Sequence, residues 1–243
     1  MIKYLFIVPY RDRQQHKTHF LKYMEYILEE YDKSSYEIII VHQKDNRPFN
    51  RGAIKNIGFL YAREKYDYYK EINFIFNDVD TIPSDKNLLD YNTTKGIIKH
   101  YYGFNFCLGG IFSVKGEDFE KMNGFPSYWT WGFEDNVIAY RAEDNNIKID
   151  RNVFFPFGDM NIIQSVDGLT RIRNNKTPTI NLLKNEKNGI RDIKNYKYNF
   201  NAETNMLDVE GFECGIEIPQ KVVKIDITKK APVIKKRPTM LFF

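Results

Sequence analysis

Residues 72–80 read INFIFNDVD, an apolar run that ends in two aspartates, Asp78 and Asp80, separated by one valine. Two similar runs precede it, YLFIVPY at 4–10 and YEIIIV at 36–41, and all three are rich in β-branched and aromatic residues. Continuous apolar runs of this length are typical of strands that are covered on both faces. They therefore predict the buried strands of a sheet.

Two amphipathic helical patterns lie between these runs. Apolar residues recur at helical spacing from Phe20 to Tyr31, and again from Ile54 to Ala62. The order strand, helix, strand, helix, strand is typical of a mostly parallel, doubly wound sheet with right-handed crossovers. The predicted fold class is therefore α/β, a Rossmann-like fold of three layers around a mostly parallel central sheet.

Ligands of such sheets bind beyond the carboxyl ends of the strands. This rule brings three distant segments to one edge: PYRDR at 9–13, NRPFNRG at 46–52 and NDVD at 77–80. Arginines are typical partners of phosphate because they are always charged and donate in a fork. Surface salt bridging is an equally good explanation for any single one of them. The arginines considered for phosphate binding are Arg11, Arg13 and Arg51.

The aspartate pair has three explanations from the sequence alone. Carboxylates at a strand end suit a divalent cation that holds a diphosphate, whereas a solvated turn is the more ordinary explanation. The run DVDTI at 78–82 also comes close to the nucleophile loop of haloacid-dehalogenase-like phosphatases. However, Ile82 stands where that loop needs Thr or Val, and the loop ends the first strand of its domain rather than the third.

The composition excludes several classes of protein. Hydrophobic residues make up 42% of the 243 residues and aromatic residues 16%, as in a globular protein. The net charge of +4 is spread along the chain, which argues against a nucleic-acid partner. No apolar run approaches about 18 residues and the chain starts with a strand-like run, so we expect no transmembrane segment, no signal peptide and a cytoplasmic location. Cys107 and Cys214 lack metal-type spacing and decide nothing about compartment.

The second half of the sequence is less regular and has no internal repeat. The run at 107–114 predicts a strand, 115–123 a helix and 221–227 an edge strand. Residues from about 170 to 200 are polar and ambiguous for helix.

The loop SYWTWGFEDN at 127–136 contains the only two tryptophans, next to Glu134 and Asp135. Tryptophan faces beside carboxylates suit a sugar, because the sugar ring stacks on the tryptophan and its hydroxyls donate hydrogen bonds to the acids. A core tryptophan with a capping acid explains the loop equally well.

Together these segments resemble the β-1,4-galactosyltransferase family, in the same order along most of the chain. The family carries Pro-Phe-Arg-x-Arg, matched by PYRDR, then Phe-Asn-Arg-(Ala/Gly), matched at 49–52, and Asp-Val-Asp, matched at 78–80. A Gly-Gly pair follows at 109–110, Asn-Gly-Phe-Pro at 123–126, and Trp-Gly-Trp-Gly-Gly-Glu-Asp, matched by WTWGFED at 129–135. Several motifs in the right order are specific where any one alone would be weak.

The resemblance implies a GT-A fold and inverting transfer of a hexose, galactose or N-acetylgalactosamine, from a UDP-sugar to a hydroxyl of a glycan or glycoconjugate. It assigns Asp80 to a Mn²⁺ ion, with Mg²⁺ as the other option, and Asp135 to the role of general base. Glu134 would contact the acceptor, and Trp131 would shield donor and acceptor. The residues assigned to the UDP-sugar are Pro9, Arg11, Arg13, Phe49, Arg51, Asp78, Val79 and Gly110.

On this basis we expect a single glycosyltransferase domain over residues 1–228. Residues 1–100 would form its nucleotide-sugar-binding half and residues 101–228 its acceptor and catalytic half. The basic, Pro-punctuated segment 229–243 would be a flexible tail.

The sequence departs from the family at the metal site. The family supplies a histidine after the catalytic loop, but all four histidines here precede residue 101. Gln164 stands at about that position, and Asn161 three residues before it. An amide oxygen binds Mn²⁺ or Mg²⁺ more weakly than imidazole binds Mn²⁺, so the need for metal stays open.

Other departures concern the sugars. Cys107 replaces a bulky tyrosine of galactose-specific members, and a small side chain leaves room for an N-acetyl group. Phe133 replaces a family glycine, while Asn136 and Val137 replace aspartates that help to place the acceptor. The donor sugar and the acceptor therefore stay open.

Two further expectations follow from the comparison with the family. The lack of a membrane anchor distinguishes the chain from Golgi-resident members and fits a viral or microbial enzyme. The missing histidine also allows a second hypothesis, a catalytically degenerate member that binds nucleotide sugar or glycan without turnover.

Overall fold

A computed structural model describes residues 1–165, 170–174 and 178–226 of the chain. The predicted tail at 229–243 lies outside these residues. The strands are β1 Tyr4–Tyr10, β2 Tyr36–Gln43, β3 Asn73–Asn77, β4 Thr81–Pro83, β5 Ile97–Gly103, β6 Ile111–Lys115, β7 Lys148–Asp150, β8 Phe155–Pro156, β9 Ile162–Gln164, β10 Thr170–Asn174, β11 Lys194–Asn201, β12 Met206–Glu213 and β13 Val222–Asp226. The helices are α1 Gln14–Ile27, α2 Arg51–Lys65, α3 Gly116–Lys121, α4 Glu134–Asp144, α5 Ile180–Lys184 and the 3₁₀ turns Tyr69–Glu71 and Ile190–Asp192.

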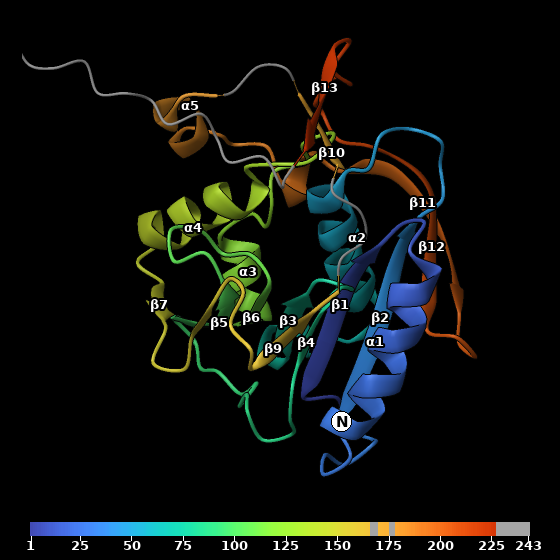
Figure 1. Ribbon diagram of the computed structural model, residues 1–243. Coiled ribbons are helices and arrows are strands. Elements are labelled where there is room, and N and C mark those ends of the chain that lie inside the picture. The colour runs from blue at the N-terminus through green and yellow to red at the C-terminus, as the bar shows by residue number, and fades with distance from the viewer. Residues whose placement is uncertain (166–169, 175–177, 227–243) are drawn as a thin grey trace, which may run out of the picture.

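One large mixed sheet organises the described residues, with strand order β11-β12-β2-β1-β3-β6-β5-β7 and β8 paired to β5. The pairs β12–β2, β2–β1, β1–β3, β5–β7 and β5–β8 are parallel, whereas β6 runs antiparallel to both neighbours. Figure 1 shows β7 and β11 at the two edges of this sheet. The α/β prediction with a mostly parallel sheet is confirmed.

The sheet is covered on both faces, as its apolar strands predict. Within β1, Leu5 and Ile7 belong to one core with α2 and α3, while Phe6 and Val8 belong to a second core with α1. Residues of one strand alternate between faces because their side chains point in opposite directions. In Figure 1, α1 lies on one side of β1 and β2 and α2 on the other.

Helix α2 is buried almost all round, which its amphipathic pattern did not predict. Its residues from Gly52 to Ala62 are all buried, including Lys55. Gly58 allows this close packing, because a Cβ there would lie 2.7 Å from the Val41 side chain and 2.9 Å from that of Ile7. Helix α2 therefore carries polar side chains directly into the interior.

The second half differs from its prediction in detail. The strand predicted at 107–114 begins only at Ile111, because Gly110 turns the chain with a φ of 68°. The ambiguous stretch of about 170–200 contains β10, the short helix α5 and most of β11, with 175–177 outside the described residues. The predicted edge strand near the C-terminus is β13, which pairs with β10 in a separate two-stranded sheet.

The described part of the chain contains no helix that is both long and apolar enough to cross a bilayer.

Candidate active site

Arg51 connects three carboxylates beyond the carboxyl ends of the central strands. It is the first residue of α2, which follows β2, and its Nη2 lies 2.5 and 2.7 Å from the two oxygens of Asp78, directly after β3. Its Nη1 donates to Glu134 Oε1 at 2.7 Å and to both oxygens of Asp135 at 3.0 Å. The structure therefore brings together Arg51, Asp78, Glu134 and Asp135, predicted from three distant motifs.

Local structure fixes the two helix starts that carry these groups. Asn50 caps α2 by accepting from the Ala53 amide at 2.9 Å, and its Nδ2 donates to the Ser127 carbonyl at 2.8 Å. Helix α4 begins at Glu134, so Glu134 and Asp135 lie in its first turn, where acidic groups are favoured by the helix dipole. The Asn50 bond ties the Trp-containing loop to the start of α2.

Two positions beside Asp135 constrain its surroundings. A Cβ at Gly109 would lie 2.8 Å from Asp135 Oδ2, so a larger residue there would have to displace the Asp135 carboxylate. Phe133, which stands where the family carries glycine, has a left-handed φ of 72°. A non-glycine residue pays about 1 to 2 kcal/mol for that conformation, so the loop stores strain directly before the two acids.

The charged groups of the cluster shift one another's pKa values. Burial alone would lower the pKa of Arg51, but Asp135, Asp78 and Glu134 outweigh it and raise that pKa. Burial would raise the pKa of Asp78, but Arg51 and Lys55 lower it. Burial and the Asp135 charge raise the pKa of Glu134. Glu134 therefore takes a proton more readily than Asp78 does.

Lys55 is the member of this cluster that sequence reasoning missed. It lies one helical turn after Arg51, so both side chains leave α2 on the same side. Its Nζ lies 3.6 Å from Asp135 Oδ1, 4.0 Å from Asp78 Oδ1 and 4.4 Å above the ring of Phe125. Its spacing of four residues from Arg51 is a sequence indication that the two side chains lie on the same side of α2. However, an amphipathic helix is expected to expose its lysines to solvent, so this spacing did not point to a buried site.

The predicted metal ligands lie at a pair of short strands, Asp80 just before β4 and Gln164 at the end of β9. Asp80 directly precedes β4, and the Ser165 amide donates to its carbonyl at 2.8 Å, while Gln164 in β9 pairs with Thr81. The Asp80 carboxylate accepts from Arg13 Nη1 at 2.9 Å and from the Thr81 hydroxyl at 3.1 Å. Gln164 Oε1 accepts from the Tyr102 hydroxyl at 2.5 Å. Among the described residues, no three His, Cys, Asp or Glu side chains are grouped as a metal site.

The remaining residues assigned to the UDP-sugar surround this edge. Arg11 donates to the Arg47 carbonyl, which joins the segment after β1 to the segment after β2. Gly110 accepts from the Asp78 amide at 3.2 Å, and a Cβ at Gly110 would lie 2.4 Å from the Tyr102 carbonyl oxygen. Val79 is buried, Phe49 is half-buried, and Pro9 lies near the end of β1.

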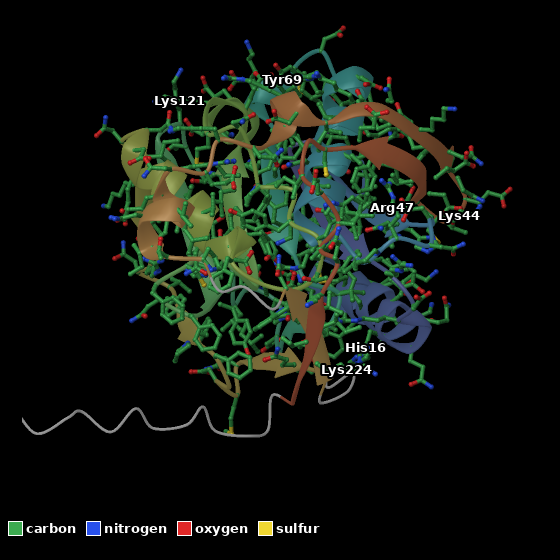
Figure 2. All side chains as sticks on the ribbon, turned by 90° about the horizontal axis from the view of Figure 1, so that it is seen from above. His16, Lys44, Arg47, Tyr69, Lys121 and Lys224 are labelled. Atoms are coloured by element: carbon green, nitrogen blue, oxygen red, sulfur yellow. The ribbon has the colours of Figure 1, made fainter. Side chains whose placement is uncertain are left out.

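The two tryptophans have different environments. Trp129 is buried and stacks on Phe212 at 5.4 Å, with its Nε1 donating to the Ile216 carbonyl at 2.7 Å. The Arg47 guanidinium lies 4.7 Å from the Trp129 ring, on the β12 side of the molecule (Figure 2). Trp131 is 51% exposed, although its amide donates to the Ile172 carbonyl in β10. Trp129 therefore fits the core explanation, and Trp131 is free to face a ligand.

Exposed aromatic rings lie close to the same edge. Phe104 stacks on Phe106 at 5.3 Å and on Phe157 at 5.2 Å, and Phe157 stacks on Tyr102 at 6.3 Å. The three phenylalanines are each about half exposed or more. Tyr102 connects this ring stack to Gln164, so the rings adjoin the predicted metal ligands.

His100 is a buried histidine behind Gly109. Its Nε2 lies 3.0 Å from the Tyr102 carbonyl and 3.1 Å from that of Gly109, while its Nδ1 accepts from Arg151 at 2.9 Å. Burial, then the Arg151 charge, lower the pKa of His100 to about 4. The ring is therefore neutral at pH 7, with its proton on Nε2.

This neutral histidine predicts a specific loss of stability in acid. Between pH 6.5 and about 4 the unfolded chain protonates this residue and the folded chain does not, so stability falls as the pH falls, in total by about 3 kcal/mol. Urea unfolding of the wild type and of His100→Gln at pH 7 and pH 4.5 should show the larger loss in the wild type. Equal losses would contradict this prediction.

A cavity of about 640 Å³ lies elsewhere, lined among others by Arg63, Gly96, Glu117 and Lys121. It lies near the end of β3 where Asn73 pairs with Lys115, whereas Asp78 follows the other end. The candidate site is instead filled by its own ion pairs.

Family models match most of the described chain in two adjoining pieces. Residues 1–92 match the N-terminal region of glycosyl transferase group 7, and residues 96–164 match the model described as the N-terminal domain of galactosyltransferase. The chain is 32% identical over 162 residues to β-1,4-galactosyltransferase 1 of Bos taurus and 33% identical over 160 residues to β-1,4-galactosyltransferase 7 of Drosophila melanogaster. The chain belongs to the β-1,4-galactosyltransferase-like family.

The relatives of this family are longer than the matched region. The match covers 61% of this chain in both cases, but 38% of the bovine protein and 47% of the Drosophila protein. The chain therefore spans less than half the length of these two curated relatives.

A solved member of the β-1,4-galactosyltransferases has the same fold. The catalytic domain of Drosophila β-1,4-galactosyltransferase 7, in complex with xylobiose, superimposes with a TM-score of 0.69 at 22% identity, covering 90% of this chain and 96% of that one. A mutant of that enzyme in complex with manganese, UDP-Gal and xylobiose gives a TM-score of 0.67 at 21% identity, with the same coverage of each chain. The predicted GT-A fold is confirmed.

Proposed function

We propose that the protein is an inverting glycosyltransferase that moves galactose or N-acetylgalactosamine from a UDP-sugar to a hydroxyl of a glycan or glycoconjugate. The observation that carries this proposal is the convergence of Arg51, Asp78, Glu134 and Asp135 at the carboxyl edge of the sheet. Membership of the galactosyltransferase family supports it, as do the UDP-Gal and xylobiose bound by the Drosophila structure of the same fold. The cytoplasmic location stays a prediction from the sequence.

The UDP-sugar lies, in this proposal, across the edge formed after β1, β2 and β3. Arg11, Arg13 and Arg51 supply three guanidinium groups for the uridine diphosphate, which would replace their present carbonyl and carboxylate partners. The other proposed contacts to the donor are Pro9, Phe49, Asp78, Val79 and Gly110.

Asp80 and Gln164 fit a Mn²⁺ or Mg²⁺ ion that is held partly by the substrate. A carboxylate and an amide oxygen at adjacent strands are hard oxygen donors, and such ions keep several positions for water and for substrate phosphate. The ion would offset charge on the leaving UDP. Arg13 already pairs with Asp80, so it would hold the carboxylate until the ion binds.

Asp135 is the proposed general base. Inversion needs a carboxylate that removes the proton from the acceptor hydroxyl as that oxygen attacks the anomeric carbon from the face opposite UDP. Glu134 is buried beside it, and its Oε2 has no hydrogen-bond partner among the described residues. A hydroxyl of the acceptor sugar would satisfy that oxygen.

Apolar rings near the base favour a sugar acceptor. Trp131 is half exposed four residues before Asp135, and the stack of Phe104, Phe106 and Phe157 adjoins the same edge. Sugar rings pack their C–H faces on such surfaces. At Cys107 the small buried thiol leaves room for an N-acetyl group on the donor, which keeps N-acetylgalactosamine beside galactose as a donor sugar.

The proposal is tested by UDP release from a panel of UDP-sugars, with Mn²⁺, Mg²⁺ or chelator, with and without sugar acceptors. We expect release with UDP-galactose or UDP-N-acetylgalactosamine, and more of it with acceptor. Binding of a donor without turnover under every condition would instead support the degenerate hypothesis. Neither binding nor turnover of any donor would refute both.

Asp80→Asn is expected to weaken Mn²⁺-dependent donor binding by at least about 10-fold, because a neutral amide replaces the charged metal ligand. Calorimetric titration of UDP with and without Mn²⁺ measures this effect. Asp85→Asn, at an exposed aspartate of the following loop, is the matched control and should bind as the wild type does. Equal metal dependence in both variants would remove Asp80 as a ligand.

A further inference from the structure

Lys55 is a buried ammonium whose position suggests a role behind the proposed base. Its side chain is 1% exposed, so it cannot reach a bound donor or acceptor. Its ion-pair partners are Asp135 at 3.6 Å and Asp78 at 4.0 Å, it lies over the Phe125 ring, and the charges of Arg51 and Glu134 also act on it. An effect of Lys55 on catalysis would therefore act through a neighbouring charged group, and Asp135 is the nearest ion-pair partner.

The charge balance of the cluster favours the charged form of this lysine. When all groups are ionised, Arg51 and Lys55 face the three carboxylates of Asp78, Glu134 and Asp135. Burial, then the Arg51 charge, lower the pKa of Lys55, while Asp135 and Asp78 oppose this shift. Loss of its charge would leave a single guanidinium among carboxylates in a buried site. A protonated Glu134 and a charged Lys55 give two charges of each sign.

Arg51 and Lys55 have different freedom to move. Arg51 is 15% exposed and begins its helix, so its guanidinium can exchange a carboxylate for the diphosphate of a donor. Lys55 is buried, and its ammonium is covered by the Phe125 ring, so it is not open to a bound diphosphate in the same way. When Arg51 turns to the diphosphate, Lys55 is the cation that stays beside Asp135.

We propose that Lys55 is a positioning residue that holds the Asp135 carboxylate in place, with a positive charge beside it, for proton removal once Arg51 is engaged by the donor. This inference rests on the proposed transferase function and adds to it a residue from outside the sequence motifs. The other charged or titratable groups that pair with Asp135 or whose pKa its charge shifts are Arg51, Glu134, His100 and Cys107, and Asp78 faces Lys55 and Arg51.

If Lys55 had a purely structural role, its replacement would change stability and not turnover. Replacement of both partners of a buried ion pair by apolar side chains is often neutral or stabilising, whereas removal of one partner is destabilising. Lys55→Met removes one partner, so a purely structural lysine predicts a lower melting temperature with unchanged kinetics in the folded variant. With Glu134 able to gain a proton and Arg51 still paired, Lys55→Met should fold. Its melting temperature reports the structural role, and its kinetics report the positioning role.

The test compares wild type, Lys55→Met and Lys65→Met in steady-state turnover of the active UDP-sugar from pH 5 to 9. Lys65 lies on the same helix and pairs with Glu37 at 2.7 Å, far from the site, so Lys65→Met should match the wild type. For Lys55→Met we expect kcat to fall about 10- to 100-fold, in the range for residues that orient a functional group. The donor KM should stay within about twofold, and the acidic limb of the kcat profile should move to higher pH.

Each outcome has a separate meaning. Wild-type kcat and pH profile in a folded Lys55→Met overturn the inference while the proposed function stands. A wild type that turns over no donor overturns the proposed function and this inference with it. If Lys55→Met does not fold, Lys55→Gln takes its place, because the amide is also neutral and keeps a polar group in the pocket. A folded Lys55→Gln with full kcat overturns the inference equally.

Discussion

Asp135→Asn is expected to lower kcat by about 10²- to 10⁴-fold, the range for loss of a general base. Binding of the UDP-sugar should be retained, because the amide keeps the shape of the side chain and leaves the three arginines of the donor site in place. Folding should also be retained, since Arg51 and Lys55 still face Asp78 and Glu134. Steady-state UDP release and calorimetric titration of the donor measure the two effects.

The matched control is Asp144→Asn, at an exposed aspartate that ends the same helix. It should turn over as the wild type does. Unchanged turnover in Asp135→Asn would remove Asp135 as the base, and a parallel loss of donor binding would assign it to the donor site instead.

Arg51→Gln is expected to cost about 3 kcal/mol of folding free energy, because it removes the shared partner of the buried Glu134 and of the partly buried Asp78 and Asp135. The loss should be smaller at low pH, where Glu134, whose pKa is raised by burial and by Asp135, holds a proton. Urea unfolding at pH 5 and pH 8 measures the loss of folding free energy and its dependence on pH. Donor affinity should fall as well.

Arg63→Gln is the control for this change. Arg63 lies near the other end of α2 and pairs at 3.2 Å with Glu120, and both side chains are about one third exposed. An exposed pair contributes about 1 kcal/mol or less. Equal losses in the two variants would mean that the Arg51 cluster is only another surface network.

The first half of the fold could be predicted because each of its elements carries a complete local signal. The runs at 4–10, 36–41 and 72–76 correspond to β1, β2 and β3 within a few residues. Apolar β-branched residues on both faces leave a buried strand as the simplest explanation. The edge that unites Arg51 with Asp78 then follows from topology alone.

The second half could not be predicted to the same degree. Its strands β7, β8 and β9 have two or three residues each, too few for a period to appear. The pairing of β12 with β2 joins residues 206–209 to 40–43 across most of the chain, and no local pattern encodes that contact. Lys55 is buried because segments that are distant in sequence cover it, among them the one that contains Phe125.

The candidate site shows the same division. The sequence predicts that the arginines and the acids lie at one edge of the sheet. It does not predict which of them form ion pairs with one another. Arg13 and Arg51 pair with carboxylates of the site itself, so the site holds its own counter-ions. The sequence indicates Gln164 as a metal ligand because it stands at about the position of a family histidine, and the structure puts it in β9, which pairs with Thr81 next to Asp80.

Inverting transfer by the carboxylate cluster at the sheet edge is tested most directly by the anomeric configuration of the product. This product is formed from an α-linked UDP-sugar and a sugar acceptor, and its configuration is read from the anomeric proton by NMR. Attack from the face opposite UDP predicts a β-linked product, formed by the wild type and lost in Asp135→Asn. An α-linked product, or the same β-linked product at the same rate from Asp135→Asn, would contradict it.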